Sequence, residues 1–173
     1  DWAEARAIRI TSPAPDRVIP FCRHFGTCGG CKWQMLPYEK QLQYKQQEAE
    51  QNLKRIGKVE LPEIMPIIGC GNSAHYRNKL EFTFSNKRFL TSDEIGSENV
   101  VAQQDALGFH VPRIFDKVID IFECYLMDDV NNKIRNTIRD FAKQQGFAFY
   151  DIKEHTGWLR NIIVRYCSTG ELM

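Results

Sequence analysis

The amino-acid sequence predicts an α+β fold: an antiparallel sheet with two helices packed on it and a cluster-binding, cysteine-rich loop beside it. Two stretches, residues 37–56 and 127–145, repeat apolar residues at helical spacing. Short stretches in which apolar and polar residues alternate surround the second of them, as expected of strands. Three cysteines and three glycines crowd into residues 20–34 without any period. Something other than apolar packing must order this segment, and a bound metal would serve.

The first predicted helix covers residues 37–56. Pro37 suits the first turn of a helix, because the N–H that proline lacks would be unpaired there. Tyr38, Leu42 and Leu53 recur at helical spacing as far as Gly57. Glycine is common just past the C-terminus of a helix, so we expect the helix to end at this residue.

The second predicted helix covers residues 127–145 and ends before Gly146. Its apolar face comprises Val130, Ile134, Ile138, Phe141 and Ala142. Beside this face, Arg135, Arg139 and Lys143 lie four residues apart and form a basic stripe. Most stripes of this kind are solvated, so we expect these side chains to face water, with contact to RNA as the alternative.

Residues 79–85 give the clearest strand signal, because Leu80, Phe82 and Phe84 alternate with polar residues. We expect the two phenylalanine rings to lie in the core rather than to stack on bases. Weaker strand signals occur at residues 2–10, 65–68, 106–110, 117–122, 147–152 and 158–167.

The sequence begins without Met and shows no secretory signal, and no apolar run approaches the length that crosses a membrane. We therefore expect a soluble, cytoplasmic protein with no membrane partner and no obligate protein partner. The turn-forming residues 12–16 mark a boundary, which gives segments 1–11, 12–36 and 37–173. Because both ends read as interrupted strands, we expect a fragment of a longer protein.

The charge balance does not point to a nucleic-acid partner, because 23 basic residues face 22 acidic ones. Only a local patch could bind phosphate. Arg77, Asn78 and Lys79 directly precede the strand at 79–85 and suit phosphate contacts. Arg160 and Lys32 are further candidates for RNA contact. For each of these charges, simple solvation is the alternative.

Six cysteines in a chain without a secretory signal favour a metal or redox site over disulfides. Cys22, Cys28 and Cys31 have the spacing C-x5-C-x2-C, which is similar to ferredoxin patterns of three close cysteines and one distant one. The fourth ligand is then Cys70, Cys124 or Cys167. Cys167 falls inside a predicted strand, where a cysteine is usually a small buried apolar residue.

Cys124 is favoured over Cys70 as the fourth ligand, because it should lie just before the second helix. The unpaired N–H groups and the dipole of a helix N-terminus stabilise a thiolate. Cys70, which lies between two glycines, stays possible as the fourth ligand. Four thiolates also suit a structural zinc ion, and inert thiols are the third reading. Zinc ribbons, however, usually bring two C-x2-C pairs, whereas this sequence has one.

Five segments of the sequence are distinctive when taken together: CRHFGTCGGCKWQ at 22–34, YRNKLEF at 76–82, LGFH at 107–110, VIDIFEC at 118–124 and WLRN at 158–161. They resemble segments of the bacterial uracil-5 methyltransferases that modify 23S ribosomal RNA. The resemblance implies a 4Fe-4S cluster on Cys22, Cys28, Cys31 and Cys124, with an RNA-contacting role for this region. It also implies that residues 1–11 are the last strand of a TRAM-type β-barrel domain.

The same resemblance implies that methyl transfer takes place in a domain absent from this sequence. Family members bind S-adenosylmethionine through a glycine-rich loop and attack uracil with a cysteine, and neither motif occurs here. No catalytic residue and no S-adenosylmethionine ligand is therefore assigned, and the fragment alone is expected to be inactive. A zinc-stapled RNA-binding module without an enzymatic parent is the alternative function, and a small electron carrier is a third.

Overall fold

The computed structural model describes residues 2–91, 94–95 and 104–173. The chain divides into two compact units. The first comprises Asp1–Phe21 and Trp33–Gly69, and the second comprises Cys22–Lys32 and Cys70–Met173. In the described part of the chain, no helix is long and apolar enough to cross a membrane.

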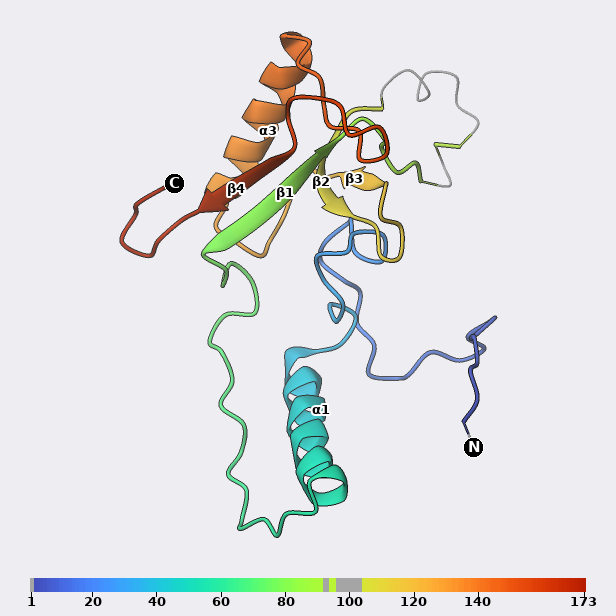
Figure 1. The fold of residues 1–173 in the computed structure, drawn as a ribbon. Coiled ribbons are helices and arrows are strands. Elements are labelled where there is room, and N and C mark those ends of the chain that lie inside the picture. Colours follow the sequence, from blue (N-terminus) through green and yellow to red (C-terminus); the bar gives the residue numbers. More distant parts are fainter. Residues whose placement is uncertain (1, 92–93, 96–103) are drawn as a thin grey trace. The chain divides into compact units, whose positions relative to one another are not determined.

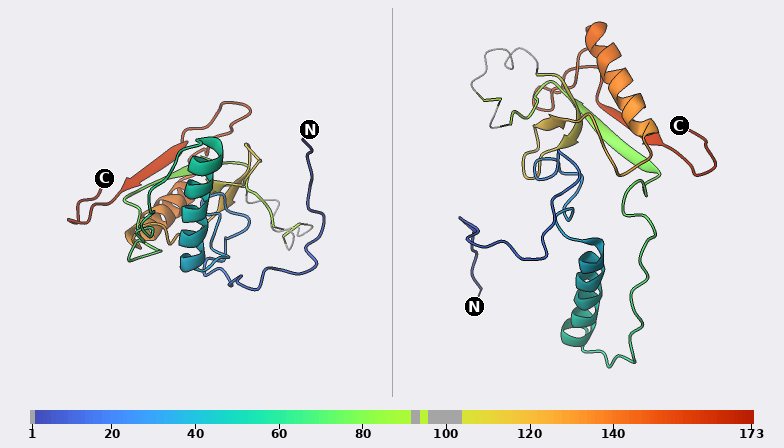
Figure 2. Two further views of the ribbon diagram at one scale, coloured as in Figure 1. Left: turned by 90° about the horizontal axis from the view of Figure 1, so that it is seen from below. Right: turned by 180° about the vertical axis from the view of Figure 1, so that it is seen from behind.

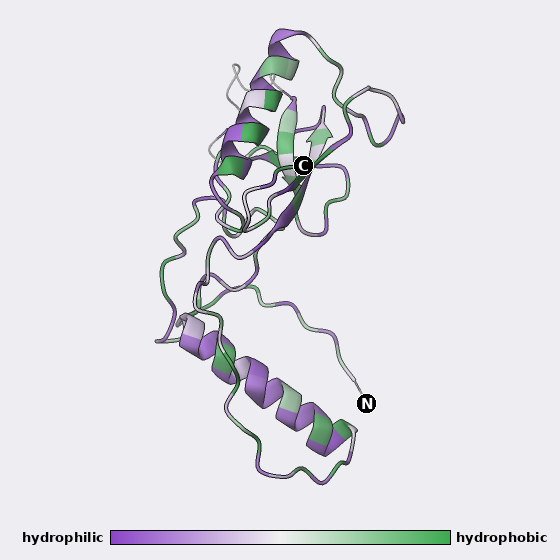
Figure 3. Cartoon of the chain, turned by 90° about the vertical axis from the view of Figure 1, so that its left-hand side faces the viewer, coloured by the Kyte–Doolittle hydropathy of each residue, from purple (hydrophilic) through white to green (hydrophobic). Residues whose placement is uncertain are grey.

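The first unit is built on helix α1 (Tyr38–Gln51), which a π-helical turn, η1 (Asn52–Ile56), continues as far as Gly57. This confirms the predicted helix. The side-chain amide of Gln41 donates to the carbonyls of Trp33 and Leu36 and so fixes the start of the helix. None of the residues of α1 is fully buried, and Figure 3 draws the helix largely in the hydrophilic colour.

Three of the weaker strand predictions are wrong, and one of them, at residues 147–152, forms only isolated bridges at Phe149 and Asp151. Residues 2–10 and 65–68 form neither helix nor strand in the structure. A strand needs a neighbour to take up its backbone hydrogen bonds, and no described strand pairs with either segment. In the second segment, Ile67 N donates to a side chain, Gln46 Oε1, at 2.9 Å.

The second unit contains a four-stranded antiparallel sheet with the order β3-β2-β1-β4, as Figure 1 shows. The strands are β1 (Lys79–Ser85), β2 (Ala106–His110), β3 (Val118–Asp120) and β4 (Asn161–Arg165). Strand β1 lies in the centre, with Thr83 opposite Gly108 of β2 and Lys79 opposite Arg165 of β4. Together with the helices α1 and α3, this sheet confirms the α+β class.

Helix α3 (Val130–Gln144) lies across one face of the sheet, as the views in Figure 2 agree. Between helix and sheet, Leu80, Phe82 and Phe84 are buried with Leu107 and Val164, which confirms the prediction for the two rings. Ile134 and Ile138 of α3 pack against this core. The prediction for Phe141 is wrong, because this residue of the supposed apolar face is more than half exposed.

Candidate metal centre

The cysteine-rich loop Cys22–Lys32 belongs to the sheet unit, although it is far from that unit in sequence. Gly29 N donates to His110 O at the end of β2 (3.1 Å). The Phe122 N–H donates to Nε2 of His24 at 3.3 Å. Burial, and secondarily the nearby Arg23, lower the pKa of His24 and so favour the neutral ring that can accept this bond. These contacts hold the loop against the segment that carries Cys124.

Two glycines in this loop are required by close packing. A Cβ on Gly29 would collide with the His110 carbonyl oxygen. A Cβ on Gly30 would lie 3.3 Å from the Phe109 ring and 3.5 Å from the Cys28 sulfur. With no side chain present, the Gly30 N–H points at Cys28 Sγ over 3.4 Å. The loop therefore turns a backbone donor towards sulfur, as loops that hold metal–thiolate groups do.

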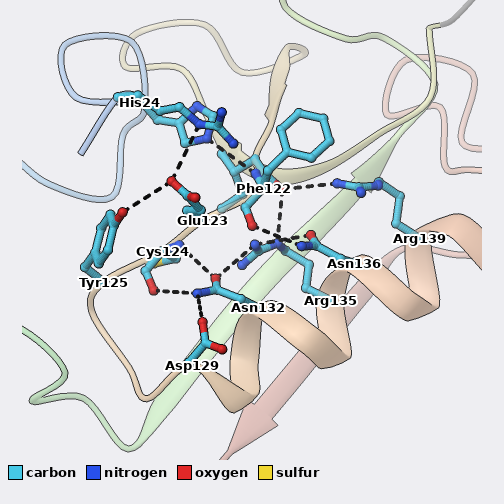
Figure 4. A network of polar contacts seen from close by, with 12 residues as sticks. His24, Phe122, Glu123, Cys124, Tyr125, Asp129, Asn132, Arg135, Asn136 and Arg139 are labelled. Atoms are coloured by element: carbon cyan, nitrogen blue, oxygen red, sulfur yellow. Dashed lines mark hydrogen bonds and ion pairs between the residues drawn. The ribbon is translucent and has the colours of Figure 1, made fainter. Parts of the chain in front are cut away.

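Cys124 lies in the buried core, and Cys28 and Cys31 pack against the same core. Two side chains of helix α3 bind the backbone of Cys124, one at its N–H and one at its carbonyl. Cys124 N donates to Asn132 Oδ1 at 2.8 Å, and Asn131 Nδ2 donates to the Cys124 carbonyl at 3.4 Å. Figure 4 shows Asn132 between Cys124 and Asp129, whose carboxylate accepts from Asn132 Nδ2 (2.9 Å).

The basic stripe of α3 is not solvated, which corrects the sequence prediction for two of its three residues. Arg135 is 0% exposed and Arg139 is 4% exposed. Arg135 Nε and Arg139 Nη1 both donate to the Ile121 carbonyl at 3.2 Å. The third residue, Lys143, is exposed. The stripe thus grips the segment that leads to Cys124.

The four cysteines of the predicted ligand set lie close enough to influence each other's ionisation. The pKa of Cys28 is raised to about 11, mainly by burial; the charges of Cys124, Cys31 and Cys22 add to the rise, and the Gly30 N–H opposes it. Burial likewise raises the pKa of Cys124, and Cys31 and Cys22 add to the effect. Buried neutral thiols of this kind become thiolates when a metal provides the opposite charge.

The helix-dipole argument for Cys124 is wrong in its cause. Helix α3 begins at Val130, six residues after Cys124, so the first turn of the helix does not include the thiol. The pKa of Cys124 is raised by burial rather than lowered by a helix N-terminus. What places Cys124 beside the loop is the asparagine pair at Asn131 and Asn132. Cys70 and Cys167 are exposed.

The residues present fit a thiolate-bound group by their chemistry: four soft sulfur donors, a backbone donor to one of them, and glycines that let the loop pack closely against β2. In the described ranges, no group of three or more His, Cys, Asp or Glu side chains is already arranged as a set of metal ligands.

The predicted RNA-contacting residues lie at two ends of the sheet. Arg77, Asn78 and Lys79 lead into β1, and the register of the sheet places Lys79 opposite Arg165 of β4. Arg160 lies at the other end of the β1–β4 pair, where its carbonyl accepts from Phe84 N and its guanidinium covers the Tyr150 ring. Lys32 is exposed at the end of the cysteine loop. The fold therefore does not join these residues into one site.

Sequence reasoning missed the amide side chains that hold Cys124. A signal was present, since Asn131, Asn132, Arg135 and Asn136 recur at helical spacing on the side of α3 next to its apolar residues. Polar residues on an inward-facing helix surface need partners. Here the partners are backbone atoms of the Ile121–Cys124 segment.

No protein-family model matches the chain. Nearly all of it (99%) aligns with a protein of Bacteroides thetaiotaomicron at 54% identity, and all of it with one of Porphyromonas gingivalis at 46%, each described as an uncharacterized RNA methyltransferase. The chain is similar to RNA methyltransferases over its whole length. It spans 38% of each of these curated relatives, and therefore little more than a third of their length.

A solved structure shares the fold. The tRNA (uracil-54, C5)-methyltransferase of Pyrococcus abyssi, in complex with S-adenosyl-L-homocysteine, superposes with a TM-score of 0.62 at 25% identity. The match covers 95% of this chain and 33% of that enzyme. The sheet unit, the helix α1 segment and their order along the chain are thus similar to part of an RNA-modifying enzyme.

Proposed function

We propose that this chain is part of an S-adenosylmethionine-dependent RNA methyltransferase that modifies C5 of uridine, and that it carries a structural 4Fe-4S cluster and contacts RNA. The observation that carries the proposal is that Cys28 and Cys31 pack against the core that contains Cys124, a residue 93 positions further along the chain than Cys31.

The cluster, when bound, supplies a rigid covalent link between four points of the chain. The chain's own residues provide the rest. Gly29 and Gly30 let the loop approach β2, His24 accepts from the Phe122 N–H, and Asn132 fixes the backbone of Cys124. Methyl transfer itself belongs to residues of the longer protein, which would bind S-adenosylmethionine and extrude the target uridine from its stack.

The metal content of anaerobically purified protein tests the cluster. We expect about four irons and four sulfides per chain, with visible absorbance. Cys124→Ser should lose them, whereas Cys70→Ser, a matched change at an exposed cysteine, should keep them. One zinc ion per chain and no visible absorbance would contradict the cluster and favour a zinc-stapled RNA-binding module instead. Loss in the Cys70 variant alone would mean that the ligand set is wrong.

The open face of the sheet supports the RNA contact. Lys79 and Arg165 lie directly opposite each other on neighbouring strands, and both are exposed. Like charges in this position destabilise a sheet unless an anion lies between them. Arg77, stacked on Tyr76 with its guanidinium carbon 6.0 Å from the ring centroid, adds a third cation just before β1. A phosphate backbone has the charge that this end of the sheet needs.

Salt-dependent binding to RNA tests this surface. Replacing Lys79 and Arg165 by Gln should weaken binding to all sequences alike and reduce the slope of log affinity against log salt by about 0.7 for each lost contact with single-stranded RNA. Glu81→Gln, on the same exposed face of β1, is the control and should not weaken binding. An unchanged salt slope in the double variant would show that this face does not bind phosphate.

The proposed substrate is 23S ribosomal RNA. Because the similar Pyrococcus enzyme is described as a tRNA methyltransferase, fragments of both RNAs should be compared at one salt concentration, in the full-length protein with S-adenosylmethionine. Methylation of ribosomal RNA fragments alone would support the proposal. Methylation of tRNA alone would overturn the substrate and leave the reaction intact.

A further inference from the structure

Helix α3 buries a positive charge that forms no ion pair with any carboxylate in the described part of the chain. Arg135 is fully buried, and within the described ranges no ion pair joins it to an acidic side chain. Its N–H groups donate instead to neutral oxygens of Ile121, Asn131, Asn132 and Asn136. Buried charges in proteins are normally paired, because removing a charge from water is costly.

Arg139, one turn further along the same helix face, shows the ordinary arrangement. It is almost as buried, yet it lies 2.9 Å from an Asp140 carboxylate oxygen and 3.6 Å from one of Asp120. The two arginines share the Ile121 carbonyl as an acceptor. The two arginines therefore differ in their contacts: Arg139 contacts carboxylates directly, whereas Asp120 and Asp129 act on Arg135 only at longer range.

The side-chain oxygen of Asn132 links Arg135 to the predicted fourth ligand. One oxygen atom, Asn132 Oδ1, accepts from Cys124 N at 2.8 Å and from Arg135 Nη2 at 3.0 Å. The guanidinium is thus one amide oxygen away from the backbone of the predicted fourth ligand, as Figure 4 shows. The Phe82 ring, 5.0 Å from the guanidinium carbon, covers it from the sheet side.

We propose that Arg135 is the buried counter-charge of the thiolate-bound centre at Cys22, Cys28, Cys31 and Cys124, and that Asn132 fixes its position relative to Cys124. This inference rests on the cluster of the proposed function. A 4Fe-4S group held by four thiolates is an anion, and nearby charges and hydrogen bonds set its stability and its reduction potential. Arg135 does not contact the centre itself; it is a positioning residue, joined to the Cys124 backbone through the side-chain oxygen of Asn132.

The test compares three variants in the cluster-bound protein: Arg135→Met, which removes the charge, Arg135→Lys, which keeps it, and Lys133→Met, which removes an exposed charge of the same helix and is the control. Iron and sulfide content, the rate of iron loss to a chelator and the midpoint potential of a dithionite titration are measured. For Arg135→Met we expect iron loss about 10- to 100-fold faster and a lower midpoint potential, because the reduced cluster carries one more negative charge. Arg135→Lys and Lys133→Met should stay close to wild type in potential.

Each result decides between the proposals. If Arg135→Met and Arg135→Lys lost iron equally fast, Arg135 would act through its hydrogen bonds alone and not through its charge, which would overturn this inference. Wild-type behaviour of Arg135→Met, in a protein that binds iron and sulfide, would overturn this inference and leave the proposed function standing. Absence of iron and sulfide from wild type would overturn both. If circular dichroism shows that Arg135→Met does not fold, Arg135→Gln, which keeps donors without the charge, takes its place.

Discussion

The link between α3 and Cys124 can be tested through stability by replacing Asn132 with Ala. The substitution removes Asn132 Oδ1, the acceptor for Cys124 N at 2.8 Å and for Arg135 Nη2 at 3.0 Å. Both donors are buried. A buried donor left without a partner costs about 1–3 kcal/mol, and a lost bond from a charged donor about 1.5–3 kcal/mol.

Together these losses predict a decrease of about 3–5 kcal/mol in the free energy of unfolding, which is a large part of the roughly 5–15 kcal/mol of a typical domain. The midpoint of thermal unfolding should fall by roughly 10 °C or more. Urea unfolding followed by circular dichroism, with all proteins stripped of metal by the same chelator, isolates the hydrogen bonds from any bound centre.

Lys133→Ala is the matched control for this experiment. Lys133 neighbours Asn132 on the same helix but is exposed, so its replacement should change the free energy of unfolding by less than about 0.5 kcal/mol. If Asn132→Ala were as small in effect as Lys133→Ala, the amide would not hold Cys124 in solution. The explanation of why Cys124 lies beside the loop would then be refuted.

Three further predictions concern the loop, the core and the pH dependence. Gly29→Ala should detach the loop from β2, because its Cβ would meet the His110 oxygen; faster labelling of Cys28 by a thiol reagent would report this, and unchanged labelling would contradict it. Phe82→Leu should lower stability without weakening RNA binding, since the ring is fully buried; weaker binding at equal folded fraction would place the ring in the interface. Hydrogen bonds, above all from Lys87, lower the pKa of Asp151. The stability that Asp151 adds should be complete above its unfolded pKa of about 3.9 and should disappear as the pH falls towards its lower folded pKa. The free energies of unfolding of wild type and Asp151→Asn, measured against pH, should therefore converge in acid.

The elements whose pattern is local could be predicted from the sequence. The alternation of β1 and the helical periods of α1 and α3 identified these three elements, because such periods can be read from the local sequence alone. The segments 2–10 and 65–68 also alternate, but no described strand pairs with them. Periodicity shows that a segment can form a strand, and only a neighbouring strand makes it one.

The basic stripe of α3 could not be interpreted from the sequence for a related reason. Arginines four residues apart look the same whether they face water or a polar backbone segment from elsewhere in the chain. Arg135 is buried because the Ile121 carbonyl and the asparagine oxygens satisfy its donors, and those acceptors come into reach only after folding. The choice of Cys124 remains a prediction, but the structure replaces the helix dipole by these contacts as its physical basis.

The course of the chain has a consequence for the order of events during synthesis. It enters the sheet unit at Cys22, leaves it after Lys32 and returns at Cys70. The loop's anchors on β2 and at Phe122 are therefore made about 80 to 100 residues after the loop itself. At a translation rate of roughly 5–20 residues per second, the first three thiols wait about 5–20 s for Cys124. During this interval they form an exposed, incomplete trio, so a cell that loads this site must protect the nascent loop or fill it only after α3 has folded.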